Sequence, residues 1–239
     1  MATISLEKTI GQLVTERPSR SRVFEKLGID YCCGGKKTIA EVCEKKMLDP
    51  GMLLEALDAE AATDADSAFD YGSMSLSELA DHIEATHHSY LRAELPRLSR
   101  MAQRVAKVHG DNDRRLQGVS DTFDAFAAEL ESHMAKEENV LFPAIRHIDG
   151  ATKMPNLPFG SVSNPIHCME QEHDGAGSAL ERMRELTDGF TPPDWACNTY
   201  RALLDGLHDL ELNMHQHVHK ENNVLFPRAI EREKELQGV

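Results

Sequence analysis

The chain carries one segment twice. Residues 133–143 read HMAKEENVLFP and residues 217–227 read HVHKENNVLFP, so eight of eleven positions match at an offset of 84 (217 − 133). A repeat at a fixed offset indicates a duplicated structural unit. A repeat kept only for packing would retain its apolar positions and lose its polar ones, whereas here the His, Lys, Glu and Asn are all retained. The repeat therefore predicts a polar function for this segment.

Helices are predicted around both copies. The chain is rich in Ala, Leu and Glu and only 5% aromatic, which favours helix over strand. Stretches rich in Gly, Pro and Asp, such as HGDNDRR and TDGFTPP, separate the amphipathic segments. We expect four long helices near residues 75–109, 117–147, 162–187 and 194–232. Short connections between four such helices predict an all-α fold built on an antiparallel four-helix bundle.

A smaller unit precedes the bundle. Residues 1–60 predict short helices that are interrupted by LGIDYCCGGKK. The following EAATDADSAFDYGSMS is small, acidic and aperiodic, which indicates a linker. We therefore divide the chain into a small helical domain at 1–60, a linker at 61–75 and the bundle at 76–239.

Charge and cysteine content limit the partners. With 26 Lys+Arg against 40 Asp+Glu, the net charge of −14 makes nucleic acid and anionic membrane surfaces poor partners. No apolar run approaches the roughly 20 residues that a membrane helix needs. The start MATISLEKTI lacks the pattern of a secretory signal. Five cysteines at irregular spacing do not suggest a disulfide framework, so we expect a cytoplasmic protein.

The repeat places a histidine and a glutamate on one helix face. Residues four apart in a helix lie one turn apart on the same side, so His133 points with Glu137 and His217 with Glu221. A glutamate buried alone in a bundle core is costly, and a cation offsets that cost. Each pair therefore predicts half of a metal site.

The other two helices are expected to complete the site. His173 lies in QEHDGAG, 44 residues before His217, and His88 lies 45 residues before His133. The duplicated unit is thus a helix pair that supplies one His and then His-x-x-x-Glu. The predicted set is His88, His133, Glu137, His173, His217 and Glu221.

This set exceeds what one ion needs. Four imidazoles and two carboxylates are too many for a single tetrahedral zinc, but they suit two metals that each take two His and share both Glu. Mixed nitrogen and oxygen ligands with open positions favour iron, with manganese or zinc as alternatives.

The choice between His87 and His88 depends on the criterion. Helical phase counted from Leu76, Leu79 and Ile83 favours His87, whereas alignment of the two halves favours His88. We take His88 and expect Pro96 or a local distortion of the helix to absorb the difference in phase.

A second unusual string, DYCCGGKK, places Cys32 and Cys33 side by side ahead of two glycines and near Lys36 and Lys37. Lysines and a helix start lower thiol pKa values, so these thiols are candidates for redox exchange or iron transfer. The alternative is a turn whose cysteines only pack. An iron–sulfur cluster usually needs four thiolates, so a cluster here would require a homodimer.

Taken together, DYCCGGKKT, HMAKEENVLFP, EQEHDGAG and HVHKENNVLFP resemble the di-iron family for repair of iron–sulfur centres, the YtfE/ScdA/DnrN type. The resemblance covers nearly the whole chain, as an ScdA-type domain followed by a haemerythrin-like bundle. It implies two iron ions in an oxo- and carboxylate-bridged centre, held by the six predicted residues with His88 rather than His87.

The resemblance also implies a function, the repair of iron–sulfur client proteins after nitrosative or oxidative stress, by iron donation. Two alternatives follow from the open metal positions: reduction of nitric oxide (NO) at the di-iron centre, or reversible binding of NO or O2 by a carrier or sensor. The DYCCGG domain favours repair, because a simple carrier has no evident need for it.

Overall fold

The computed structural model describes residues 4–63 and 71–238, and within them the protein is all-α, as predicted. The only β-type pairing in these residues is one isolated bridge between Thr9 and Thr38. No helix in the described part of the chain is long and apolar enough to cross a membrane.

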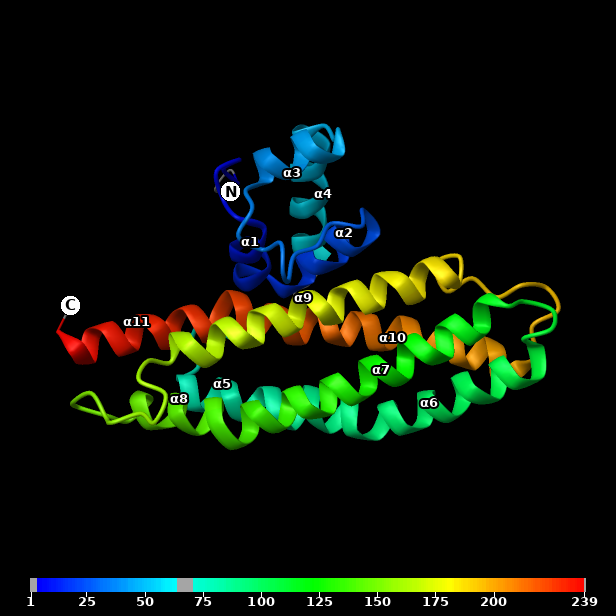
Figure 1. Ribbon diagram of the computed structural model, residues 1–239. Helices are drawn as coiled ribbons and strands as arrows, with labels where there is room; N and C mark the ends of the chain where they lie inside the picture. The colour runs from blue at the N-terminus through cyan, green and yellow to red at the C-terminus, as the bar shows by residue number, and fades with distance from the viewer. Residues whose placement is uncertain (1–3, 64–70, 239) are drawn as a thin grey trace.

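Four long helical segments lie side by side in a bundle (Figure 1). Three of them contain a π-helical turn, here labelled η. Their elements are α5 (Leu76–Ile83), η2 (Glu84–His88) and α6 (Ser89–His109); α7 (Arg115–Lys136), η3 (Glu137–Leu141) and α8 (Phe142–Asp149); α9 (Ser163–Leu186); and α10 (Asn198–Lys220), η4 (Glu221–Leu225) and α11 (Phe226–Gln237). The predicted segments match these within a few residues, and the last helix begins at Asn198 rather than near 194.

The bundle core consists of two separate apolar clusters. One fills the half formed by α6, α7, α10 and the end of α9, with Leu98, Phe123 and Leu207 among its buried members. The other fills the half formed by α5, α8 and α11, and includes Ile83 and Phe226. Between the two clusters lies a layer of buried polar side chains, which is where the predicted site residues fall.

The π-helical turns set the phase of the helices at this layer. A π turn adds one residue, so every later side chain is rotated by about 100° relative to a continuous α-helix. In η2 this extra residue moves His88, instead of His87, onto the face defined by Leu79 and Ile83. The local distortion expected near His88 is therefore the π turn, whereas Pro96 lies farther along, inside α6.

The repeated Val-Leu-Phe tail lies mainly in the core, as its apolar composition favours. Leu141, Phe142, Leu225 and Phe226 are fully buried. Val140 differs, because it is 45% exposed.

The N-terminal helices form their own small core. They are α1 (Ile10–Glu16), the 3₁₀ turn η1 (Pro18–Arg20), α2 (Ser21–Lys26), α3 (Ile39–Lys46) and α4 (Pro50–Thr63). Capping boxes at Thr9 and Thr38 satisfy the first free N–H groups of α1 and α3. Phe24, Tyr31 and Leu57 are buried in the apolar cluster that these helices share. Helix α4 continues to Thr63, and residues 64–70 of the predicted linker lie outside the described residues.

This small unit docks on the bundle beside α9, α10 and η4 (Figure 1). Asn223 of η4 donates from Nδ2 to the carbonyl oxygen of Cys32 at 2.9 Å. Gly11 and Gly35 enclose the Asn223 side chain, and Lys36 forms an ion pair with Glu170 of α9 at 2.9 Å. The Cys-Cys loop is thus fixed against the same turn that carries Glu221.

Gly35 tests this docking. A Cβ atom there would lie 2.3 Å from Asn223 Oδ1 and 2.7 Å from the Tyr31 carbonyl oxygen, so Gly35→Ala should loosen the loop from η4. We expect faster hydrogen exchange at residues 30–36 and unchanged exchange in α6 and α7. Gly177→Ala is the control, because nothing lies within 4 Å of its Cβ position. A Gly→Ala change inside a helix should stabilise the folded protein by up to about 1 kcal/mol. Wild-type exchange at residues 30–36 in Gly35→Ala would contradict the docking.

Candidate metal centre

Four imidazoles converge in the polar layer of the bundle. The Nε2 atoms of His88 and His217 are 3.2 Å apart, and those of His133 and His173 are 3.1 Å apart. All four rings are at most 3% exposed. They come from all four helical segments, so the bundle itself brings these side chains together.

Two carboxylates lie among these rings. Glu137 Oε2 is 3.3 Å from His88 Nε2 and 3.4 Å from His133 Nε2. Glu221 approaches His217 Nε2 at 2.8 Å and His173 Nε2 at 3.1 Å. Both glutamates are fully buried, and their four oxygens accept no hydrogen bond of acceptable geometry from the described residues. Buried carboxylates in this condition need compensating positive charge.

The donor atoms fall into two overlapping groups. His88, His217, Glu137 and Glu221 each offer one ligand atom within 4.8 Å of the others, and His133 and His173 form a second group with the same two glutamates. The donor set therefore fits two cations, because each group offers two nitrogens and both groups share the two carboxylates. All six predicted residues belong to these groups.

Three of the four imidazoles are oriented by an acceptor behind them. His88 Nδ1 donates to Glu138 at 2.7 Å, His133 Nδ1 to Glu172 at 2.9 Å, and His173 Nδ1 to the amide oxygen of Asn222 at 2.8 Å. A proton fixed on Nδ1 leaves the Nε2 lone pair directed into the site, which is the state that a metal requires. These three acceptors were not predicted from the sequence, although each lies next to a predicted ligand position.

His87 points away from the four-imidazole cluster. Its Nδ1 is 3.1 Å from Asn213 Oδ1, its Nε2 is 2.6 Å from Lys220 Nζ, and its ring stacks on His217 with centroids 5.2 Å apart. Burial lowers the pKa of His87 to about 2 and that of Lys220 to about 8. A buried basic group therefore borders one end of the site. His219 is also buried, in contact with Thr15 and Tyr31.

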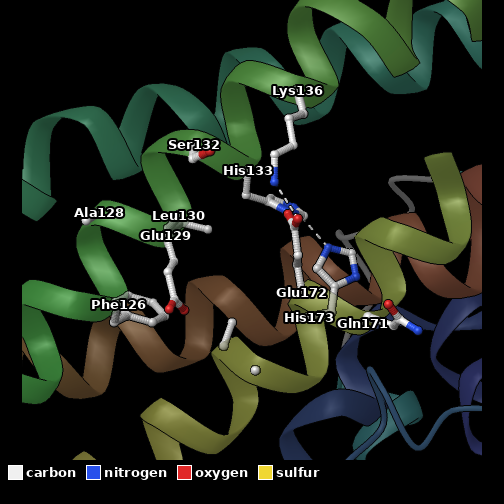
Figure 2. A pocket seen from close by; sticks show the side chains of 12 residues that line it. Phe126, Ala128, Glu129, Leu130, Ser132, His133, Lys136, Gln171, Glu172 and His173 are labelled. Atoms are coloured by element: carbon white, nitrogen blue, oxygen red, sulfur yellow. Dashed lines mark hydrogen bonds and ion pairs between the residues drawn. The ribbon is translucent and has the colours of Figure 1, made fainter.

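A cavity of about 530 Å³ opens next to the other end (Figure 2). His133 and His173 line it together with apolar residues such as Phe126 and Leu130. Figure 2 shows Lys136 reaching toward Glu172 at this wall, and the two form an ion pair. The cavity offers small molecules an approach to this pair of imidazoles.

Cys32 and Cys33 lie in the loop that docks against η4. The Asp30 carboxylate accepts hydrogen bonds from the backbone N–H groups of both cysteines at 3.0 Å, and from the Cys32 thiol. The hydrogen bond to Cys33 and burial raise the pKa of the Cys32 thiol, so the lowered pKa expected there is wrong for this residue. The thiol with a lowered pKa, of about 7, is instead Cys197, because His109 hydrogen-bonds to it.

The two cysteines nevertheless lie near a residue that orients one of the site imidazoles. They line a cavity of about 190 Å³ together with Asn222, whose amide oxygen holds His173. Asn222 therefore borders both the cavity of the thiol loop and an imidazole of the site. Asn223 beside it holds the loop, so the repeated Asn has a polar role in the second copy.

The fold and the buried His/Glu layer define an iron-binding, haemerythrin-like protein. Residues 79–229 match the haemerythrin HHE cation-binding domain family, and residues 6–61 match the ScdA_N family, described as a domain of unknown function. The iron–sulfur cluster repair protein YtfE of Dickeya chrysanthemi is 37% identical over 227 residues, which cover 95% of this chain and 98% of that protein. The YtfE protein of Citrobacter koseri is 38% identical over 226 residues, 94% of this chain and 97% of that protein.

The chain belongs to the family of YtfE-type iron–sulfur cluster repair proteins, with a haemerythrin-like domain and an ScdA-type N-terminal domain. The resemblance inferred from the four motifs is thereby confirmed.

The site also predicts a pH dependence for the chain without metal. Burial opposes a charge on His133, but Glu137 and Glu221 outweigh it and raise the pKa from its usual 6.5 to about 9. A raised folded-state pKa contributes stability that is complete below about pH 6.5 and is lost as the pH rises toward 9.

We therefore expect the thermal unfolding midpoint of chelator-treated protein to fall between pH 6.5 and 9, measured by calorimetry. His133→Gln removes this titrating group and should make the decline shallower. A wild-type midpoint that stays constant or rises over this range would contradict the assignment.

Proposed function

We propose that the six side chains hold a pair of iron ions. His88 and His217 bind one ion, His133 and His173 bind the other, and Glu137 and Glu221 bridge both. Three observations support this set: the two overlapping donor groups, the four carboxylate oxygens without hydrogen bonds, and the acceptors behind three of the imidazoles. When bound, the ions supply exchangeable iron and electrons to this site.

The chain repairs damaged iron–sulfur clusters in client proteins by donating iron. The single observation that carries this function is the cavity that Cys32 and Cys33 share with Asn222, the residue that holds the His173 imidazole. Thiols are good iron ligands, so this loop offers an intermediate position between the buried site and the surface. Iron transfer then needs only exchange of ligands and no redox step: the thiols lose their protons as they bind iron, and the imidazoles and carboxylates that release it can take protons up. The names of the YtfE relatives support the same function.

The free thiols support a cytoplasmic location. All five cysteines are free, which is the state that a reducing cytoplasm maintains. The clients are therefore cytoplasmic iron–sulfur proteins.

A second function is favoured by the cavity beside His133 and His173. Its apolar lining suits small uncharged ligands such as NO or O2, which would reach one edge of the iron pair. A pair of metals there could hold two NO molecules for reduction, or one ligand reversibly.

Repair is tested with an iron–sulfur enzyme whose cluster has been oxidised or nitrosylated. Anaerobic iron-loaded protein should restore its activity faster than an equal amount of free ferrous iron. Glu221→Gln should abolish this advantage, because it removes a ligand that both ions share. His147→Ala is the matched control, since His147 is exposed and outside the site, and it should behave as wild type.

The thiols are tested in the same assay. Replacing Cys32 and Cys33 by Ser should leave the iron content unchanged and slow the recovery. Recovery no better than with free ferrous iron would contradict donation by the wild-type protein. Formation of nitrous oxide by the diferrous protein exposed to NO would establish the second function instead.

A further inference from the structure

The two halves of the metal centre can be compared residue by residue through the internal repeat. The offset of 84 pairs His133 with His217 and Lys136 with Lys220, and it also pairs Glu137 with Glu221 and Glu138 with Asn222. An offset of 85 (173 − 88) pairs His88 with His173, and it therefore pairs His87 with Glu172. The repeat thus maps the His88/His217 metal position onto the His173/His133 metal position. Where two paired residues differ, the surroundings of the two metal positions differ.

The repeat is broken at the acceptor behind the second-copy imidazole. His133 Nδ1 donates to Glu172 at 2.9 Å, and Glu172 in turn pairs with Lys136. His217 Nδ1 is buried and has no hydrogen-bond partner among the described residues. It is the one imidazole of the four whose outer nitrogen lacks an acceptor in that part of the chain.

His87 explains this gap. It occupies the position that corresponds to Glu172, and its ring lies parallel to His217, with an angle of 9° between the ring planes. A stacked ring presents its face, so its nitrogens cannot accept a hydrogen bond in the plane of His217. They lie instead near Asn213 and Lys220, the counterpart of Lys136.

The remaining acceptors do not compensate for this loss. At the His133/His173 position both imidazoles have one, Glu172 and Asn222. At the His88/His217 position only His88 has one, Glu138. An acceptor behind a metal-bound imidazole fixes its tautomer and raises its basicity, and its loss typically lowers metal affinity about 10- to 100-fold.

We propose that the two metal positions are unequal, and that the His88/His217 position binds its iron about 10- to 100-fold more weakly because His87 replaces an acceptor. This inference rests on the proposed function, since it requires a centre for two ions. It adds that the ion at the His88/His217 position is the more weakly held of the pair. The cavity opens at the tighter position, so the difference concerns equilibrium affinity and not access.

The test compares occupancy at the two positions. Crystals of the full chain are grown anaerobically with one equivalent of ferrous iron, and anomalous scattering at the iron edge gives the occupancy of each position. In the wild type, the His133/His173 position should hold at least about ten times more iron. A competition titration with a ferrous chelator should show two steps separated by the same factor.

Two variants exchange the residues that differ. His87→Glu gives His217 an acceptor and Lys220 a carboxylate, so the occupancies should approach each other. Glu172→His places a histidine behind His133, as His87 lies behind His217. It should therefore lower the iron affinity of the His133/His173 position. Because Glu172 is partly exposed, this variant tests the proposal even if His87→Glu fails to fold. Glu185→His, an exposed change on the same helix, is the control and should match wild type.

The outcomes separate the two claims. Equal wild-type occupancies at limiting iron, or an iron distribution that Glu172→His leaves unchanged, would overturn the inequality. Failure to bind a second ion at saturating iron would instead refute the two-ion centre itself.

Discussion

Two glutamates buried between the apolar halves of the bundle determine the chemistry of this protein. Removing a carboxylate from water costs several kcal/mol, and no hydrogen-bond donor in the described structure offsets that cost for Glu137 or Glu221. Without metal, protonated imidazoles must supply the positive charge, which is why the pKa of His133 rises. Bound cations would supply this charge instead and would release the imidazoles to act as neutral ligands. The two buried carboxylates therefore lower the stability of the bundle without metal, and together with the four imidazoles they form a donor set that suits cations.

The helices accommodate this layer through irregular backbone. Each of the three π-helical turns contains or begins at a site residue: His88 ends η2, Glu137 begins η3 and Glu221 begins η4. A continuous α-helix would rotate the residues beyond the layer by about 100° and expose part of the second apolar cluster. With the added residue, each of these helical segments directs apolar side chains into both clusters and polar side chains into the layer between them. The turn η4 has a further use, because its next two residues, Asn222 and Asn223, orient His173 and hold the cysteine loop.

Much of this arrangement could be predicted from the sequence because it depends on the number of residues between repeated positions. The amphipathic segments and their Gly- and Pro-rich separators predicted the helices, and the internal repeat with its His-x-x-x-Glu pairs predicted the six converging side chains. Helical phase alone favoured His87, because a π turn leaves no simple mark in an amphipathic pattern. The burial of His219 and the acceptor role of Asn222 depend on where the small domain and the helices pack, which spacing does not encode. The raised pKa of Cys32 depends likewise on its folded contacts with Asp30 and Cys33, whereas the flanking lysines suggested the opposite.

The most direct test of the account is the iron content of anaerobically reconstituted protein, combined with its Mössbauer spectrum. We predict two irons per chain, with spectra of a magnetically coupled pair in the oxidised state, and loss of coupling in Glu137→Gln or Glu221→Gln. A single iron per chain after full reconstitution, or two irons with the spectra of isolated ions, would contradict the shared carboxylate centre.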